Sequence, residues 1–219
     1  MLNGGKTIKA LFLDIGGVML TNGWDTAARV EAANIFSLDF AEMNGRHRII
    51  FDAYESGKTT LDEYLDLLVF YEPRAFSKEE FKTFMAEKSQ PYPDMLKLIS
   101  DIKHKYNLRT IAVNNEGREL NEYRVKQFNL RSFIDVFASS CYIHVRKPDK
   151  DIYNMAIDLA QVDPDEAIYV DDRLVFIQAA QKMGINTIHH TDISNTIEAF
   201  ATFGIETENL TENTNSLSN

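Results

Sequence analysis

Residues 8–18 read IKALFLDIGGV, an apolar run that ends at Asp14 and is followed by Gly16 and Gly17. The run is too short for a typical helix and is apolar on both faces, which is typical of a strand buried in a parallel sheet. Two glycines close after the carboxylate leave its side chain accessible and let the backbone approach a ligand. The stretch therefore predicts a buried first strand with Asp14 at its carboxyl end.

Four further apolar runs of the same kind follow along the chain, at residues 108–113, 133–138, 167–170 and 185–188. Between them lie segments with the helical spacing of apolar residues, at 93–106, 151–161 and 174–183. Pro93 stands near the start of the first helix and Gly184 follows the last, which are positions that proline and glycine favour. Because strands and helices alternate from residue 92 onward, we predict an α/β fold with a doubly wound parallel sheet.

Residues 22–90 interrupt this alternation and read as helices, at 25–35, 40–53, 61–71 and 78–87. Aromatic residues are dense in this segment, which indicates a small core of its own. We therefore predict an α/β core domain of residues 1–21 and 91–205 with an inserted α-helical cap domain of residues 22–90. Residues 206–219 are rich in Asn, Thr, Ser and Glu and read as a polar tail.

The composition, 44% hydrophobic and 26% charged over 219 residues, is that of a globular protein and excludes a disordered chain or a disulfide scaffold. The net charge of −10 argues against a nucleic-acid partner, because such a partner needs a basic face. The single cysteine, Cys141, points to a reducing compartment, and no apolar run is long enough to cross a bilayer. No targeting signal stands out, so we expect a cytoplasmic protein without membrane contact; the sequence leaves its oligomeric state open.

Polar side chains follow four of the predicted strands, where open α/β sheets bind ligands beyond the carboxyl ends of the strands. They are Asp14, Asn114, Asn115, Lys147, Asp171 and Asp172. Three carboxylates at one edge of a sheet are costly unless a cation neutralises them, and oxygen ligands of this kind suit Mg²⁺. The residues together predict a magnesium site with a lysine and amide donors beside it.

Each of these residues, taken singly, also has a structural explanation. Asp171 and Asp172 would cap the helix that follows them. Lys147 would be a solvated loop residue. Asn114 and Asn115 would belong to a turn. Only the combination at one sheet edge favours a catalytic site.

This order of elements and residues resembles the haloacid dehalogenase superfamily, whose members are mostly Mg²⁺-dependent phosphatases. The resemblance covers residues 8 to about 204, and its most specific parts are the pair Lys147-Pro148 and the acidic pair Asp171-Asp172 after an apolar strand. Residues 22–90 are similar to the helical cap that the family inserts after its first motif, and ESGKTTLDEY at 55–64 resembles a stretch common in such caps. The resemblance implies the family's fold, a Rossmann-like core with a cap.

The resemblance also implies a mechanism for a small phosphorylated substrate. Asp14 would attack phosphorus and form an aspartyl-phosphate, while Lys147 would hold the phosphate oxygens and Asp14 in place by charge. Asn114 and Asn115 would donate hydrogen bonds to the phosphoryl oxygens.

The cofactor that the resemblance implies is Mg²⁺. Asp14, the backbone carbonyl of Gly16 and Asp172 would hold it. Asp171 would be a further ligand, or an acidic residue that contacts the ligands and not the metal.

Two positions depart from the family pattern. Gly16 stands where family phosphatases have a second aspartate, which protonates the leaving group and then activates water. Asn114 stands where they have Ser or Thr, and an amide still donates to a phosphate oxygen. Glycine offers no acid, and general acid–base help is typically worth about 10²–10⁴ in rate. Glu116 or a cap residue is the alternative acid, although Glu116 by itself reads as a solvated residue.

Three functions follow from these observations. The first is a Mg²⁺-dependent phosphatase, and the second is a phosphate-binding module that kept the metal site and lost the acid. The third is a 2-haloacid dehalogenase, because such relatives keep the nucleophile and lack the second aspartate. They bind no metal and typically carry serines in place of the acidic pair, so Asp171-Asp172 argues against the third reading.

Overall fold

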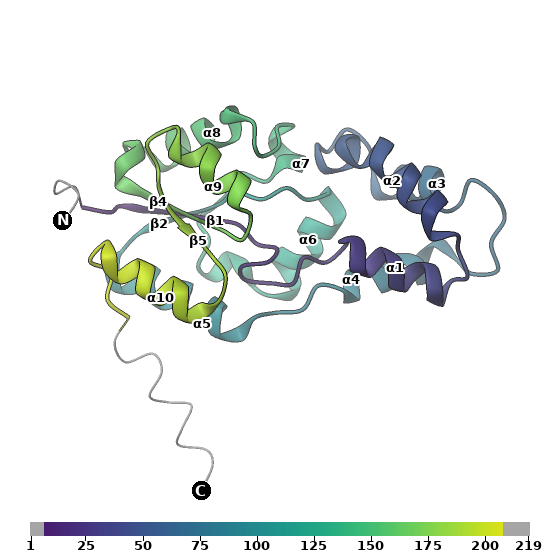
Figure 1. Ribbon diagram of the computed structural model, residues 1–219, viewed down its shortest axis with the longest axis horizontal. Helices are drawn as coiled ribbons and strands as arrows, with labels where there is room; N and C mark the ends of the chain where they lie inside the picture. Colours follow the sequence, from purple (N-terminus) through teal and green to yellow (C-terminus); the bar gives the residue numbers. More distant parts are fainter. Residues whose placement is uncertain (1–6, 208–219) are drawn as a thin grey trace, which may run out of the picture.

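The computed structural model describes residues 7–207 and has a five-stranded parallel sheet at its centre (Figure 1). Its strands are β1 (Ala10–Leu13), β2 (Arg109–Ala112), β3 (Val136–Phe137), β4 (Ala167–Asp171) and β5 (Asn186–His189). The order is β3-β2-β1-β4-β5, so the chain builds the sheet to one side of β1 and then crosses to the other. The predicted doubly wound α/β fold is confirmed, and its switch point lies between β1 and β4.

The register of the sheet brings the ends of its central strands to one level. Leu13 of β1 pairs with Ala112 of β2 and with Val170 of β4. The residues that come next in β1 and β4, Asp14 and Asp171, therefore leave the sheet at the same edge.

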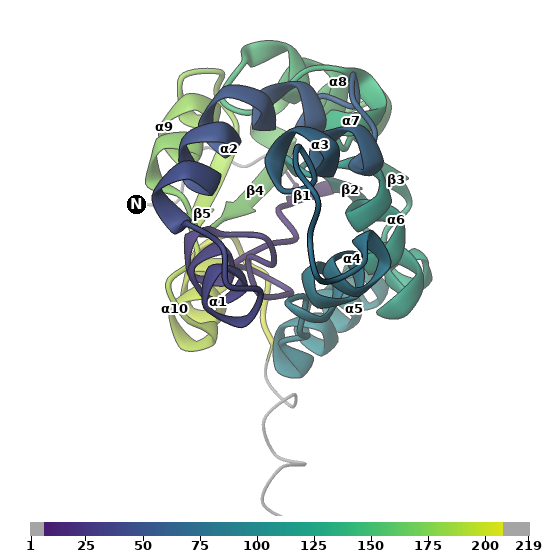
Figure 2. The same cartoon turned by 90° about the vertical axis from the view of Figure 1, so that its right-hand side faces the viewer.

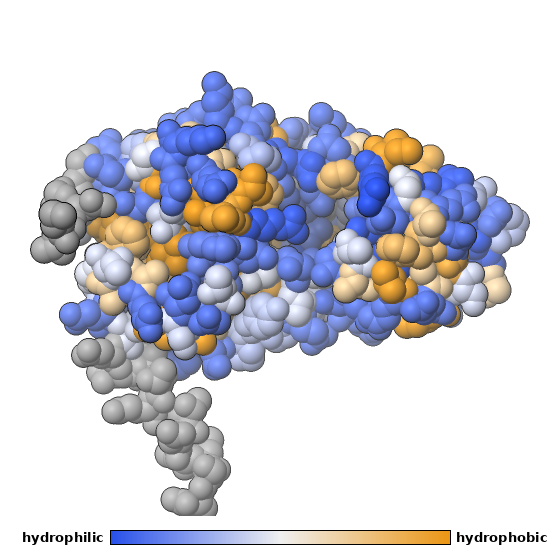
Figure 3. Space-filling view, viewed as in Figure 1, coloured by the Kyte–Doolittle hydropathy of each residue, from blue (hydrophilic) through white to orange (hydrophobic). Residues whose placement is uncertain are grey.

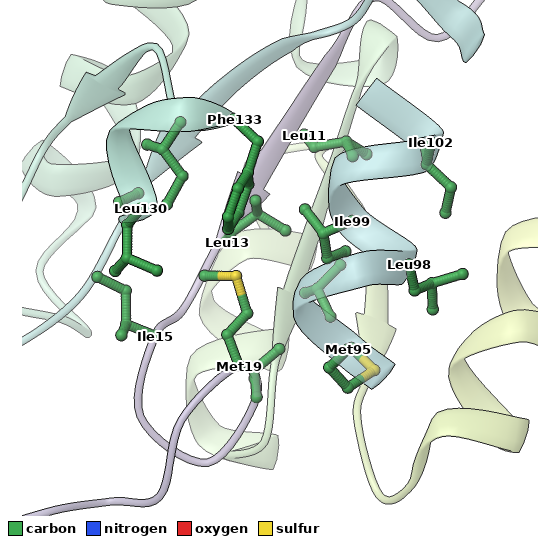
Figure 4. Packing of buried hydrophobic residues seen from close by; sticks show 14 of the residues in the cluster. Leu11, Leu13, Ile15, Met19, Met95, Leu98, Ile99, Ile102, Leu130 and Phe133 are labelled. Atoms are coloured by element: carbon green, nitrogen blue, oxygen red, sulfur yellow. The ribbon is translucent and has the colours of Figure 1, made fainter. Parts of the chain in front are cut away.

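Helices cover both faces of the sheet. They are α5 (Pro93–Tyr106), α6 (Arg118–Gln127) and α10 (Ile193–Thr202) on one face, and α8 (Lys150–Ala160) and α9 (Leu174–Gln181) on the other. Successive residues of β1 point to opposite faces, so that Leu11 and Leu13 pack with α5, whereas Ala10 and Phe12 pack with α8 and α9. Figure 4 shows the first of these layers, with Leu11 and Leu13 beside Ile99. Both faces of the central strand are thus buried, as its apolar sequence predicts.

Four helices make up the inserted segment: α1 (Thr26–Ile35), α2 (Phe40–Glu55), α3 (Leu61–Leu68) and α4 (Lys78–Glu87). Reciprocal capping boxes start α3 and α4. The four helices share an apolar cluster around Phe81, which Leu120 of α6 joins, apart from the two clusters that flank the sheet. Figure 2 shows these helices over the carboxyl ends of the strands. We call residues 22–90 the cap; its boundaries stay a prediction, and most of the predicted tail, residues 208–219, lies outside the described residues.

Two segments run side by side where the core meets the cap, and we call them the neck (residues 20–21 and 88–91). The neck includes the last three residues of the cap. Leu20 and Pro91 form an antiparallel bridge. The backbone N–H of Thr21 donates to the carbonyl oxygen of Gln90 at 2.8 Å, and the Gln90 N–H donates to Thr21 Oγ1 at 2.9 Å. Thr21 Oγ1 itself donates to the Lys88 carbonyl at 2.6 Å. The two ends of the cap segment are therefore tied together at one place.

The structure adds helices that the apolar spacing does not predict, namely α6, α10 and the short α7 (Ser140–Ile143). The buried side of α6 includes Asn121 and Arg124, so its apolar periodicity is interrupted by polar residues with partners in the core. The strand predicted over 133–138 is only two residues long in the structure, Val136 and Phe137, and a 3-10 turn (Leu130–Ser132) lies before it. Within residues 7–207, no helix combines the length and the apolar character that crossing a membrane requires.

Candidate active site

The carboxyl ends of β1 and β4 bring three carboxylates together. Asp14 follows β1, Asp171 ends β4, and Asp172 comes next along the chain. One oxygen from each lies within 4.8 Å of the others, and Asp14 and Asp171 are buried. Carboxylates this close repel one another when ionised, so the cluster needs positive charge beside it.

Lys147 supplies one positive charge from a buried position between two of these carboxylates. Its Nζ lies 2.6 Å from Asp171 Oδ2 and 3.1 Å from Asp14 Oδ1. Asn115 fixes the loop that carries it, since Asn115 Nδ2 donates to the Lys147 carbonyl (3.0 Å) and the Lys147 N–H donates to Asn115 Oδ1 (2.8 Å). The alternative reading of Lys147 as a solvated loop residue is therefore wrong. The side chain of Asn115 is itself engaged in holding the lysine.

The two adjacent aspartates have different surroundings. Asp171 accepts hydrogen bonds from Lys147 Nζ, from the Tyr169 hydroxyl and, at 2.7 Å, from the backbone N–H of Arg173. Asp172 Oδ1 is buried and has no hydrogen-bond partner among the residues that the structure describes. A buried oxygen left in this way costs free energy unless an ion or a ligand satisfies it.

Glycine is required beside Asp172. Gly17 has a positive φ of 77°, and a Cβ atom placed on it would lie 2.3 Å from Asp172 Oδ2. The loop after β1 therefore approaches the carboxylate more closely than any other residue would allow. Three carboxylates against one lysine, with an unsatisfied oxygen among them, form a donor set that fits a hard divalent cation such as Mg²⁺.

The pKa values of the cluster reflect this crowding. Burial raises the pKa of Asp14 to about 7, with Lys147 opposing the shift and Asp171 and Asp172 adding to it. Burial and the neighbouring Asp171 also raise the pKa of Asp172. A cation bound among these oxygens would favour their ionised forms and lower both pKa values.

Position 16 faces a buried ion pair. A Cβ atom on Gly16 would lie 3.3 Å from Asn22 Oδ1 and 3.6 Å from Arg124 Nη1. Arg124 Nη1 in turn lies 2.8 Å from Glu116 Oε2, and both side chains are buried. The expectation that Glu116 is solvated is therefore wrong. Burial raises the pKa of Glu116, and Arg124 opposes that shift.

Asn114 is buried beneath the same edge of the sheet. Its Nδ2 donates to Asn121 Oδ1 at 3.0 Å, and its Oδ1 accepts from Ser139 Oγ at 2.7 Å. It also lines the cavity described next, so a hydrogen bond from Asn114 to a phosphoryl oxygen stays a prediction.

A cavity of about 490 Å³ separates these residues from the cap, and Figure 3 shows the molecule hollowed between its core and its helical part. Its walls include, from the core, Asp14, Gly16, Asn114, Asn115, Glu116, Arg124 and Lys147, and, from the cap, Trp24, Arg29, His47, Phe51, Tyr54 and Tyr64. This volume is in the range of small-molecule sites. Every core residue predicted for the site except Asp171 and Asp172 lines the cavity, and these two lie beside Asp14.

Tyr54 brings the cap into direct contact with the core. Its ring stacks on Tyr64 with a centroid distance of 4.6 Å, and a Cβ atom on Gly117 would lie 2.0 Å from Tyr54 Cζ. The ring thus rests against the backbone of Gly117, and only glycine permits this approach. The Tyr54 hydroxyl is buried and has no partner within residues 7–207.

Four residues at the site escape the sequence reasoning. Tyr169 lies inside an apolar strand and Arg124 inside a polar helix, so neither gives a local signal of its contacts. Tyr54 and Arg29 come from the cap, where helical spacing reveals which residues are buried but not which of them face the core. The sequence shows Arg29 only as a charged residue within a predicted helix, and such residues are mostly exposed.

The comparisons with known proteins agree with this arrangement. Among curated relatives, the chain is 26% identical to the sesquiterpene phosphatase astK of Aspergillus oryzae, over 85% of this chain and 91% of the relative. It is 24% identical to (S)-2-haloacid dehalogenase 4A of Burkholderia cepacia, over 80% of this chain and 77% of the relative. Mouse acyl-CoA dehydrogenase family member 10 is 25% identical over 85% of this chain. The chain covers 18% of that mouse protein, and 21% and 22% of two further relatives, so it spans less than a quarter of their length.

Solved structures share the fold. A HAD family enzyme from Bacteroides thetaiotaomicron superposes with a TM-score of 0.71 at 22% identity, over 83% of this chain and 93% of that one. Further structures of that enzyme contain magnesium and inorganic phosphate.

A family model described as haloacid dehalogenase-like hydrolase matches residues 54–190. The match includes Lys147 and the acidic pair at the end of β4 but begins after Asp14. It spans more than half of the chain, and the sheet, the inserted helices and the cluster at the strand ends agree with it. The chain therefore belongs to the haloacid dehalogenase-like hydrolase family.

Proposed function

We propose that this protein is a Mg²⁺-dependent phosphomonoesterase that acts on small phosphorylated metabolites through an aspartyl-phosphate. The observation that carries the proposal is the buried cluster at the ends of β1 and β4, where Lys147 contacts Asp14 and Asp171 while Asp172 Oδ1 has no partner among the described residues. A phosphoryl group beside Asp14 would bring negative charge to a place that already holds three carboxylates. Such a substrate therefore requires both the lysine and a cation.

Asp14 is the nucleophile of the proposed reaction. One of its oxygens forms a bond to phosphorus while the ester oxygen leaves with the bonding electron pair, which gives an acyl phosphate and an alkoxide. Water then attacks that phosphorus, and inorganic phosphate and the Asp14 carboxylate are released. Lys147 holds Asp14 at 3.1 Å and presents a fixed positive charge to the phosphoryl oxygens.

The metal ligands in this proposal are Asp14, the backbone carbonyl of Gly16 and Asp172. When bound, Mg²⁺ supplies charge that offsets the repulsion between Asp14 and the phosphoryl oxygens. Because protein donors engage both oxygens of Asp171, we place this residue behind the ligands, where it positions Lys147. Two findings support a magnesium ion and a phosphoryl substrate. A neighbour of the same fold contains magnesium and inorganic phosphate, and one relative is a phosphatase.

Gly16 favours a second candidate, a phosphate-binding module with little turnover. No side chain at position 16 protonates the leaving group, and Arg124 in the facing wall is a cation paired with Glu116. A dehalogenase is the third reading, and relatives of that activity exist. A cytoplasmic location and the absence of nucleic-acid partners stay predictions from the single cysteine and the net charge of −10.

Hydrolysis of p-nitrophenyl phosphate with and without Mg²⁺, beside a halide-release assay on 2-haloacids, separates the three functions. The phosphatase predicts release of p-nitrophenol that stops when the metal is removed and in Asp14→Asn. Calorimetric Mg²⁺ binding without turnover would favour the binding module. Metal-independent halide release would refute the proposal in favour of a dehalogenase.

A further inference from the structure

A buried arginine of the cap lines the cavity that also holds the proposed nucleophile. Arg29 belongs to α1, is only 6% exposed, and lines the same cavity as Asp14 and Lys147. Arginine stays charged in proteins, and a buried charge is costly unless it is paired. The partners of this guanidinium therefore decide what it does.

The partners that the structure gives Arg29 are neutral. Its Nη1 donates to the Trp24 carbonyl at 3.0 Å, its Nη2 to Thr26 Oγ1 at 3.1 Å, and its Nε to Asn44 Oδ1 at 3.2 Å. A guanidinium has five N–H groups, so these three hydrogen bonds leave N–H groups of Arg29 that can donate to a ligand. Within residues 7–207, no carboxylate forms an ion pair with Arg29.

Two other arginines that line the cavity, Arg124 and Arg146, differ from Arg29 in this respect, whereas Arg173 at the cavity wall is exposed. Arg124 is paired with Glu116 at 2.8 Å, and Arg146 with Glu55 at 2.5 Å. Asp25 and Glu55 do act on Arg29 through space. Asp25, however, caps α1 by accepting from the Ala28 N–H at 2.9 Å, and Glu55 is already bound to Arg146. The charge of Arg29 therefore remains available to a ligand in the cavity.

Arg29 and Arg146 bring positive charge to the cavity of a protein of net charge −10, where Asp25 and Glu55 already have the partners named above. Burial, followed by the charges of Arg29, Arg146 and Arg48, lowers the pKa of the nearby His47 to about 4. Its neutral ring has Nδ1 2.7 Å from the Tyr64 hydroxyl, which also accepts from Trp24 Nε1 at 2.9 Å. This end of the cavity thus combines fixed aromatic walls with a cation, an arrangement suited to an anion.

We propose that the substrate carries, besides the phosphoryl group attacked by Asp14, a second anionic group that binds Arg29. The inference rests on the proposed function and names its substrate class: small phosphate esters with a second carboxylate or phosphate at the far end. A guanidinium matches either group through two parallel hydrogen bonds. A cavity of about 490 Å³ holds a molecule of this kind.

Calorimetry with three non-hydrolysable ligands in the presence of Mg²⁺ tests the inference. Propylphosphonate offers one anion, 3-phosphonopropionate adds a carboxylate, and propane-1,3-bisphosphonate adds a second phosphonate. The native protein should bind one of the two-anion ligands at least about tenfold more tightly than propylphosphonate, as expected for a charge-assisted hydrogen bond. The tighter of the two identifies the class of the second anion.

Variants assign the effect to Arg29. Arg29→Gln should reduce the preference to within about threefold, and Arg29→Lys, which keeps the charge without the fork, should retain an intermediate preference. Arg46→Gln is the matched control, because Arg46 belongs to the same cap, is paired with Glu42 and does not line the cavity, and it should leave the preference unchanged. A preference that survives Arg29→Gln would overturn the assignment.

Ligand binding and hydrolysis by the native protein already test the inference, so the test does not depend on whether a variant folds. An active phosphatase that binds all three ligands equally refutes this inference and leaves the proposed function standing. Selective binding of a two-anion ligand by a protein that hydrolyses no phosphate ester supports the binding of a second anion by Arg29 and refutes the proposed function. Failure to bind any of the three ligands refutes both.

Discussion

Replacing Gly16 by aspartate tests how the leaving group obtains its proton. In the native protein no side chain at position 16 supplies one, so the rate should fall steeply as the leaving group becomes more basic. Aryl phosphates would react readily and alkyl phosphates slowly. Gly16→Asp should flatten this dependence by placing a carboxylic acid beside Asp14.

The structure sets the size of the gain. Gly16 has no positive φ, unlike Gly17, so an aspartate enters without the backbone strain of the left-handed region. Its Cβ would lie 3.3 Å from Asn22 Oδ1, which must shift by a few tenths of an ångström. Arg124 Nη1 would be 3.6 Å from that Cβ, and its charge would lower the pKa of the new acid. A general acid contributes about 10²–10⁴, so we expect the lower end, about 10²-fold on alkyl phosphates.

The assay is kcat/KM for phosphate monoesters of graded leaving-group pKa, measured on the native protein and the variant. Gly16→Asn is the control, because it has the same size and cannot donate a carboxylic proton. A shallow dependence in the native protein would refute the reasoning and show that another group is the acid. Glu116, which is buried and paired with Arg124, would be the first residue to replace, with Glu116→Gln.

Three further predictions concern the site and the cap. Asp14→Asn should abolish turnover, and in metal-free buffer it should stabilise the fold more at pH 8 than at pH 4. The pKa of Asp14 is about 7 in the folded protein and near 3.8 in the unfolded chain. Ionisation of Asp14 therefore lowers the free energy of unfolding of the native protein as the pH rises through this window, by at most about 4 kcal/mol. Thermal unfolding at the two pH values checks this, and an equal shift at both would contradict it. Asp172→Asn should weaken Mg²⁺ binding by at least roughly 10–100-fold in calorimetry, and unchanged affinity would remove Asp172 from the ligands. Gly117→Ala should displace the Tyr54 ring and cost about 1–3 kcal/mol of unfolding free energy, measured by denaturant titration; an unperturbed midpoint would show that the cap adjusts freely.

The candidate site was predictable in large part, because open α/β sheets bind ligands beyond the carboxyl ends of their strands. Asp14 and Asp171 each follow an apolar run, and the parallel register brings such residues together whatever lies between them in sequence. Lys147 is different: it stands several residues beyond its strand, where its position is a weaker signal, and the family resemblance strengthens that signal through the pair Lys147-Pro148. In the structure, two hydrogen bonds between the Asn115 side chain and the Lys147 backbone fix the position of Lys147.

The cap side of the cavity was not predictable from spacing. Helical periodicity shows that Tyr54 and Arg29 lie on helices, but the face that a helix turns toward the core depends on tertiary packing. Glu116 reads as solvated because its ion-pair partner, Arg124, stands eight positions further along the chain in a helix that itself lacks apolar periodicity. Buried polar pairs of this kind become visible only when both partners are placed in space.

The neck has a consequence for how such a protein changes its preferences. Since Thr21 and Gln90 are joined by hydrogen bonds, the 22–90 segment starts and finishes at nearly the same point, like an insertion in a surface turn. A segment with adjoining ends places little geometric demand on the chain that receives it. Another helical module with the same end-to-end spacing would therefore graft onto Thr21 and Gln90 while the strand tips keep their register. In the proposed function, the residues that react and the cap residues that contact the substrate would then belong to two separable parts of one chain.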